Sequence, residues 1–112
     1  MPNQENNIHA VRDFWQNANV IKANTVIIVK ASVVYTDLRT NKILYRSEEP
    51  IDVYIDTVND YDVIVPDLPN ELGCFGRFST YRQEMKYEKG ILTIKGKGNP
   101  DVGKNSYAVT LI

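Results

Sequence analysis

Residues 25–36 read TVIIVKASVVYT, and this stretch decides the fold class. Eight of its twelve residues are Val, Ile or Thr. Branching at Cβ stiffens a side chain and favours a pleated strand over a helix. Because no Gly or Pro interrupts the stretch, the sequence predicts one strand. Residues 26–29 are apolar on both faces, which predicts a central strand that is covered on both sides.

The same bias extends over the whole chain of 112 residues, where Val, Ile and Thr number 30 and Leu and Ala only 11. A hydrophobic share of 43% is too high for a disordered chain. The length fits one domain, and no apolar run approaches the roughly 18 residues of a membrane helix. The composition therefore predicts a soluble globular domain rich in β-strands.

Further alternating or apolar segments predict the other strands, which lie at residues 43–48, 51–58, 61–65, 77–88, 91–94 and 106–112. Turn signals separate them, above all Asn41 and the pair Lys89-Gly90. The connections are too short for parallel crossovers. We therefore predict an all-β fold, an antiparallel β-sandwich of about seven strands, immunoglobulin-like or jelly-roll-like, with a small barrel as the alternative.

The N-terminal region is different. Residues 1–7 are polar and predict a flexible tail, and residues 8–112 predict a single β-sandwich domain. Apolar residues then recur at helical spacing: Ile8, Val11, Phe14 and Trp15. This spacing predicts one short helix, with Asn7 as its N-cap. No secretory signal is apparent, so the compartment stays open.

Charge is distributed unevenly although the net charge is only -1. Residues 47–76 carry eight acidic side chains and no basic one. One interpretation is cross-strand pairing with basic neighbours such as Lys86, Arg82 or Arg46. The other is an exposed acidic patch for a basic partner or a cation. The chain as a whole is not basic, so we expect no nucleic acid as a partner.

Motifs for catalysis or cofactors are weak. Residues 98–104 match the phosphate-binding pattern G-x-x-x-x-G-K, but Asn105 follows where Ser or Thr is needed, and no helix follows. Cys74 and His9 are too few for a zinc site. The Asp and Asn residues at 56–62 lack the calcium-loop pattern. We therefore expect no cofactor, no metal and no enzymatic activity.

One strand carries a candidate ligand site. Asp52, Tyr54 and Asp56 should project from the same side of strand 51–58. A tyrosine ring can stack on a sugar while flanking carboxylates accept hydrogen bonds from its hydroxyl groups. The alternative is a tyrosine on the outer face of an ordinary strand. The first interpretation predicts a small glycan- or ligand-binding module.

The favoured hypothesis is a non-catalytic interaction or assembly module that works through sheet edges and loops. The last strand is expected at a sheet edge, where it can pair with another chain. Its side chains Tyr107, Val109 and Leu111 are then candidate partner contacts. Trp15 is either a partner anchor or part of the core. The partner is a protein or a second copy, and membrane insertion is not expected.

Overall fold

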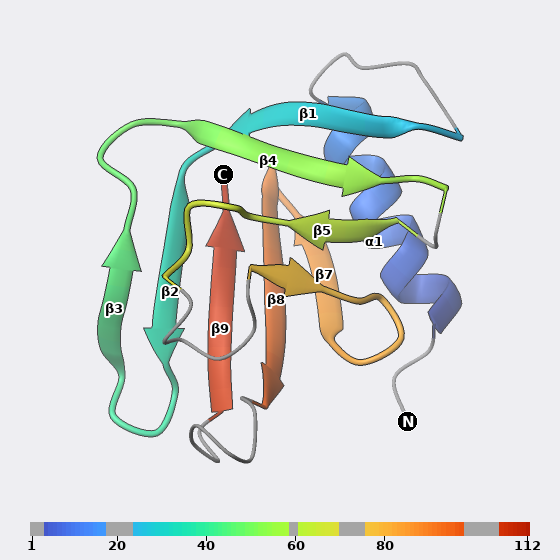
Figure 1. Cartoon of the computed structure of the whole chain (residues 1–112). Helices are drawn as coiled ribbons and strands as arrows, with labels where there is room; N and C mark the ends of the chain where they lie inside the picture. Colours follow the sequence, from blue (N-terminus) through green and yellow to red (C-terminus); the bar gives the residue numbers. More distant parts are fainter. Residues whose placement is uncertain (1–3, 18–23, 59–60, 70–75, 98–105) are drawn as a thin grey trace.

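The computed structural model describes residues 4–17, 24–58, 61–69, 76–97 and 106–112. These residues form one helix and nine strands (Figure 1). The elements are α1 (Gln4–Asn17), β1 (Val26–Ala31), β2 (Val33–Asp37), β3 (Lys42–Arg46), β4 (Ile51–Asp56), β5 (Asp62–Ile64), β6 (Arg77–Phe78), β7 (Glu84–Glu88), β8 (Ile91–Lys97) and β9 (Ser106–Leu111). No helix among these residues is long and apolar enough to cross a membrane.

The strands form two antiparallel sheets. Sheet A has the order β1-β4-β5-β6, and sheet B has the order β3-β2-β9-β8-β7. In Figure 1 the strands of sheet A lie across those of sheet B at a steep angle, as in orthogonal sandwiches. The all-β antiparallel β-sandwich with one N-terminal helix is thus confirmed, with nine strands rather than about seven.

Two predicted strands are each divided between the sheets. The stretch at 25–36 breaks at Ser32, where the chain leaves sheet A and enters sheet B. The Ser32 and Ile112 backbones exchange two hydrogen bonds, of 3.1 and 3.0 Å, which hold this corner. The stretch at 77–88 breaks at a turn in which the Arg82 and Gln83 amides donate to the Ser79 carbonyl. Alternation predicts extended backbone but not which sheet it joins.

The central position predicted for residues 26–29 is wrong. Among the described strands, β1 is an edge strand whose sole partner is β4. Ile27 and Val29 are buried, whereas Val26 and Ile28 are 49% and 51% exposed. The strand therefore alternates between a core face and a solvent face, although both faces are apolar in sequence.

Two predicted turns are confirmed. Asn41 has a φ of 59°, the left-handed conformation that asparagine tolerates. Lys89 and Gly90 both have positive φ, 55° and 80°, as a two-residue type I′ hairpin turn requires. This turn fixes the register of β7 against β8, with Glu88 opposite Ile91.

Helix α1 begins at Gln4, before the predicted N-cap Asn7. Residues 4–7, predicted as part of a flexible tail, are thus helical. Asn7 is therefore an internal residue of the helix and not its N-cap. Its side chain is buried and hydrogen-bonds to the backbone of Thr80 and Met85, before and within β7. The helix runs beside β7 (Figure 1). Four of its side chains enter the core: Ala10, Val11, Phe14 and Trp15.

One core joins α1 to both sheets. Val11 of the helix, Val53 and Ile55 of sheet A, and Leu92 and Ile94 of sheet B all have no exposed surface. Stacked and tilted aromatic rings fill the rest of this interior, with the Tyr35 and Phe78 rings 5.3 and 6.0 Å from Tyr107.

Candidate functional site

The residues predicted as partner contacts on the last strand lie in the core, so that prediction is wrong. Strand β9 is paired on both sides, with β2 and with β8. Tyr107, Val109 and Leu111 are at most 2% exposed. The last strand in sequence lies near the middle of sheet B because strand order is set by long-range pairing.

Trp15 is also part of the core. It is 4% exposed, and its ring stacks on that of Tyr61 at a centroid distance of 6.4 Å. Its indole Nε1 is the buried side-chain polar atom that lacks a hydrogen-bond partner within the described residues. The interpretation of Trp15 as an exposed partner anchor is therefore wrong, and the alternative of a core residue is correct.

Asp52, Tyr54 and Asp56 lie opposite the solvent-facing residues of β1, so they share the outer face of sheet A. Asp56 is nevertheless only 8% exposed. One Arg77 nitrogen lies 3.6 Å from the Asp56 carboxylate and 3.1 Å from that of Asp62. Asp56 is thus engaged within the protein, which leaves Asp52 and Tyr54 as the accessible part of the predicted site.

Tyr54 lies in an apolar row across sheet A. Its Cα partners are Ile28 on β1 and Ile64 on β5. On one side of this row the Lys30 ammonium lies 2.7 Å from the Asp52 carboxylate. That carboxylate accepts a hydrogen bond from Lys30 and raises its pKa above the usual value of 10.5. The outer face of sheet A thus carries an apolar row with one tyrosine beside an exposed ion pair.

The acidic segment is partly neutralised by neighbouring strands, as the first interpretation of its charge predicts. The bases that pair with Asp52, Asp56 and Asp62 are Lys30 and Arg77. Among the described residues, no ion pair joins this segment to any of the three bases named from the sequence. Lys86, for example, lies 3.1 Å from Glu88 on its own strand.

Strand β3 is an exposed edge of sheet B. Within the described residues it pairs only with β2, and it lies at the outside of the molecule in Figure 1. Ile43 and Leu44 are 44% and 45% exposed. Lys42 and Arg46 lie at its two ends and are also exposed. The edge thus offers an apolar centre between two cations.

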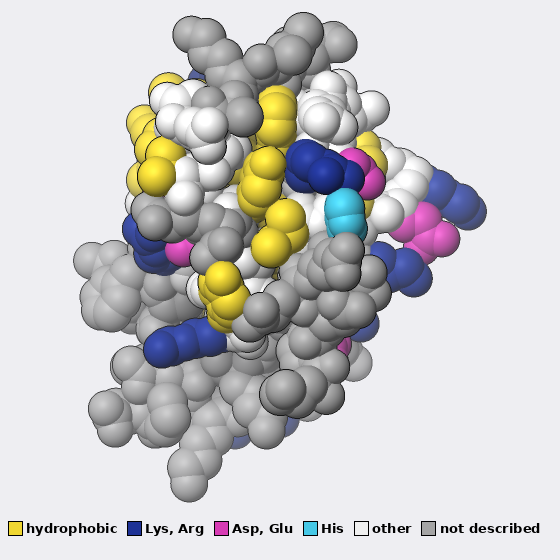
Figure 2. Space-filling view, turned by 90° about the vertical axis from the view of Figure 1, so that its right-hand side faces the viewer, with side chains coloured by type: hydrophobic (Ala, Val, Ile, Leu, Met, Phe, Trp, Pro, Cys, Tyr) yellow, Lys and Arg dark blue, Asp and Glu magenta, His cyan; other side chains and the backbone are white. Residues whose placement is uncertain are grey.

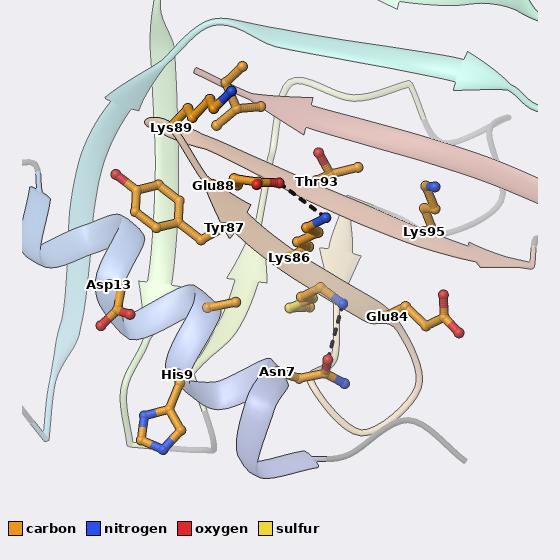
Figure 3. A pocket seen from close by; sticks show the side chains of 13 residues that line it. Asn7, His9, Asp13, Glu84, Lys86, Tyr87, Glu88, Lys89, Thr93 and Lys95 are labelled. Carbon is orange, nitrogen blue, oxygen red and sulfur yellow. Dashed lines mark hydrogen bonds and ion pairs between the residues drawn. The ribbon is translucent and has the colours of Figure 1, made fainter.

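A groove of about 930 Å³ lies between α1 and the other edge of sheet B (Figure 3). The helix forms one wall, and β7 with part of β8 forms the other. Figure 2 shows the side of the molecule that carries this helix. The lining residues are Asn7, His9, Ala10, Asp13, Glu84, Met85, Lys86, Tyr87, Glu88, Lys89, Ile91, Thr93 and Lys95.

Asn7 closes one end of this groove. Its Nδ2 donates to the carbonyls of Thr80 (2.8 Å) and Gln83 (2.7 Å), and its Oδ1 accepts from the Met85 amide (3.1 Å). The Gln83 carbonyl and the Met85 amide flank Glu84. A residue of a parallel added strand would use the same two groups. The side-chain amide of Asn7 therefore takes the place of a peptide group on the β7 edge.

The next groups along this edge face the groove. The Met85 amide bonds to Asn7, so Met85 is not hydrogen-bonded to its β8 partner. Because such pairs alternate in an antiparallel ladder, Tyr87 also directs its backbone groups away from β8. The Met85 carbonyl and the Tyr87 amide and carbonyl thus form an open rung beside α1, with no hydrogen-bond partner in the part of the chain that the structure describes. Both residues line the groove.

Charged side chains surround this rung. Glu84, Lys86 and Glu88 alternate with the inward-facing Met85 and Tyr87, so they lie on the outer face of β7. Figure 3 shows Lys86 and Glu88 joined by their ion pair at the centre of the groove. The groove therefore presents the pattern acid, base, acid next to open backbone groups.

The sequence alone did not predict this groove. The alternation Glu84-x-Lys86-x-Glu88 does indicate a strand with one polar face. The packing of α1 beside that strand depends on long-range contacts, such as the hydrogen bond between Asn7 and Met85, which are 78 positions apart in the sequence. The pattern at 98–104 and Cys74 lie outside the described residues. Within the described ranges, no cluster of three His, Cys, Asp or Glu side chains could hold a metal.

Comparisons with known proteins add no relationship. No family model matches the sequence, and no match was found among curated proteins or solved structures.

Proposed function

We propose that this chain is a non-catalytic binding module that takes up an extended segment of a partner as an added strand of sheet B. The main site is the groove between α1 and β7. The observation that carries the proposal is the open rung formed by Met85 and Tyr87, next to the rung that Asn7 occupies. Strand addition supplies affinity through main-chain hydrogen bonds and specificity through alternate side chains.

The charges on β7 indicate the chemistry of the segment. Side chains that lie opposite each other on neighbouring strands are favourable when their charges differ and unfavourable when they are alike. A strand beside Glu84, Lys86 and Glu88 is therefore favoured with the pattern base, any residue, acid, any residue, base. Apolar residues between them would contact Tyr87 and Ala10, which line the same groove.

A titration with two synthetic peptides tests this proposal. The probe is Thr-Lys-Val-Glu-Val-Lys-Thr, and the control Thr-Glu-Val-Lys-Val-Glu-Thr has the charges exchanged. In two-dimensional NMR spectra we expect the probe to shift the amide signals of Tyr87 and Glu88 in a saturable manner. The control peptide should bind roughly tenfold more weakly, because like charges then lie opposite each other.

A backbone control separates strand addition from simple charge attraction. N-methylation of the central Val-Glu-Val residues of the probe removes the peptide donors that face β7 in either strand direction and keeps every charge. We expect it to abolish binding if the peptide adds to the β7 edge. Equal binding by the methylated and unmethylated probes, or shifts confined to residues outside the groove, would contradict the proposal.

A second candidate function is glycan or small-ligand binding at the outer face of sheet A. It is supported by Tyr54, which lies in an apolar row beside the Lys30–Asp52 ion pair. A glycan array with the Tyr54→Ala variant as control tests it. We expect binding by the wild-type protein that the variant loses. The absence of binding by both proteins would exclude this candidate.

A further inference from the structure

The described strands leave two edges on each sheet, β1 and β6 in sheet A and β3 and β7 in sheet B. Three of these edges have features that commonly protect a strand from pairing with its own copy. Strand β6 has two residues, the ladder of β3 with β2 contains a register shift, and β7 carries three charged side chains. Strand β1 has six residues in unbroken register with β4, and its single charged side chain is Lys30. It is therefore the least protected edge.

Every second residue of β1 directs its backbone groups away from β4. The Thr57 amide donates to the Thr25 carbonyl (3.1 Å), so these two opposed residues form a hydrogen-bonded pair. Because such pairs alternate along an antiparallel ladder, the outward groups are those of Val26, Ile28 and Lys30. Among the described residues these groups have no hydrogen-bond partner.

The side chains of the same residues lie on the outer face of sheet A. Val26 and Ile28 are about half exposed. Ile28 lies opposite Tyr54 of β4, which lies opposite Ile64 of β5. An apolar row thus crosses the sheet and ends at the β1 edge, where an added strand can bury it.

A second copy of β1 fits this edge in one antiparallel register, with Ile28 of each copy opposite Ile28 of the other on a two-fold axis. Val26 of each copy then lies opposite Lys30 of the other. The outward backbone groups of both strands coincide in this register, so each opposed pair exchanges two main-chain hydrogen bonds. The apolar rows of the two copies meet at the axis.

Charge agrees with this register. Lys30 lies at one end of the edge. Val26, at the other end, lies beside Asp56 and Asp62, which share Arg77. The two-fold axis brings the basic end of each copy against the acidic end of the other. The two Lys30 residues are about 13 Å apart along the strands, so like charges do not oppose each other.

We propose that two copies of this chain pair through β1, which joins their A sheets into one continuous sheet. The interaction surface is the edge at Val26, Ile28 and Lys30, and the partner is a second copy. The inference does not rest on the proposed function, because it uses sheet A and not the groove at β7. Each copy contributes the same surface, so association closes at the dimer.

Sedimentation equilibrium of the full chain, from micromolar to millimolar concentration at low salt, tests the proposal. We expect the mass of the wild-type protein to rise to that of a dimer and no further. The Ile28→Lys variant places two lysines opposite each other at the axis, and it should weaken the dimer at least roughly tenfold. The matched control is Ile43→Lys, which changes a similarly exposed isoleucine on the β3 edge and should dimerise as the wild-type protein does.

Position 26 provides a test that a folding defect cannot imitate. Val26→Glu places an acid opposite Lys30 of the other copy, whereas Val26→Lys places a base there. We expect the first variant to dimerise at least roughly tenfold more tightly than the second. Asp56 lies opposite the same position within one chain, so it favours the lysine variant. Urea unfolding in dilute solution, where the protein is monomeric, should therefore rank the two variants in the reverse order.

Isotope-filtered NMR of a mixed labelled and unlabelled sample tests the register. Ile27 of one copy and Val29 of the other form a non-hydrogen-bonded pair, with Cα atoms about 4.5 Å apart, so their Hα protons should give an intermolecular signal. Four outcomes would overturn the inference: a monomer at millimolar concentration, growth beyond a dimer, unchanged association of Ile28→Lys, or the absence of this signal in the dimer. A protein that stays monomeric but binds the probe peptide keeps its groove function.

Discussion

At the scale of single residues, Gly76 and Gly90 share positive φ, 71° and 80°, but not their surroundings. A Cβ on Gly76 would lie 2.1 Å from the Val65 carbonyl oxygen, whereas a Cβ on Gly90 would have no atom within 4 Å. We expect Gly90→Ala to lower the free energy of unfolding by about 1–2 kcal/mol, from backbone strain alone. Gly76→Ala adds a clash with rigid backbone, for a total of about 2–5 kcal/mol.

Urea unfolding of both variants measures this difference. Equal losses of stability in Gly76→Ala and Gly90→Ala would contradict this prediction. They would mean that the Val65 carbonyl moves aside without a cost in free energy, so that the close approach of residue 76 to Val65 does not affect stability.

Tyr45 titrates abnormally. Its pKa is raised above 10.0, mainly by burial and further by the charge of Asp67. The folded protein then holds the phenol proton more tightly than the unfolded chain. The stability from this difference is present below pH 10 and is lost as the pH rises through the folded-state pKa. We expect Tyr45→Phe to reduce the loss of stability in alkali, measured by urea unfolding as a function of pH.

Spectrophotometric titration provides the control for this assignment. Subtraction of the Tyr45→Phe curve from the wild-type curve gives the Tyr45 transition, whose midpoint we expect above pH 10. Asp67→Asn should lower that midpoint only in part, because burial is the larger cause. A midpoint at or below pH 10 would contradict the assignment.

Residue-scale predictions from sequence were correct where they depended on near neighbours. Alternation along one strand correctly grouped Asp52, Tyr54 and Asp56 on one face. It could not foresee that Arg77, on a strand far along the chain, engages Asp56 and leaves it buried. Local periodicity contains no information about such a partner.

At the scale of elements, the side chain of Asn7 connects α1 to the β7 edge by hydrogen bonds. Asn7→Ala would leave the Met85 amide and the carbonyls of Thr80 and Gln83 without this partner. We expect a loss of about 2–4 kcal/mol in the free energy of unfolding, because buried unsatisfied polar groups are costly. Urea unfolding measures the loss, and the Met85 amide should exchange its hydrogen faster. Asp13→Ala, at an exposed position of the same helix, should change stability by less than about 0.5 kcal/mol.

Element types were easier to predict than their positions. Branched side chains in TVIIVKASVVYT correctly predicted extended backbone. The break at Ser32 was missed because no Gly or Pro marks it; the corner depends on hydrogen bonds to Ile112, 80 positions away. The last strand was likewise correct as a strand and wrong as an edge. The order of strands in a sheet depends on pairing between segments that are distant in the sequence. Neither the spacing of apolar residues nor the composition predicts this pairing.

At the scale of the whole molecule, a single core connects α1 to both sheets, so we expect one cooperative unfolding transition. Trp15 is the only tryptophan, and it is buried at the helix–sheet contact. Its fluorescence should therefore change at the same urea concentration as the far-ultraviolet circular dichroism of the strands. A fluorescence transition at lower urea would instead show that α1 detaches before the sheets unfold.

The central position of β9 has a mechanical consequence. Traction applied through Ile112 along the strand loads the ladders with β2 and β8 in shear, so many hydrogen bonds must rupture at once. Traction perpendicular to β3 peels one ladder, bond after bond. The force needed to unfold sheet B should thus be high when it is applied along β9 and low when it is applied across β3. Optical tweezers with handles attached at Ile112 or on β3 can measure this difference in unfolding force.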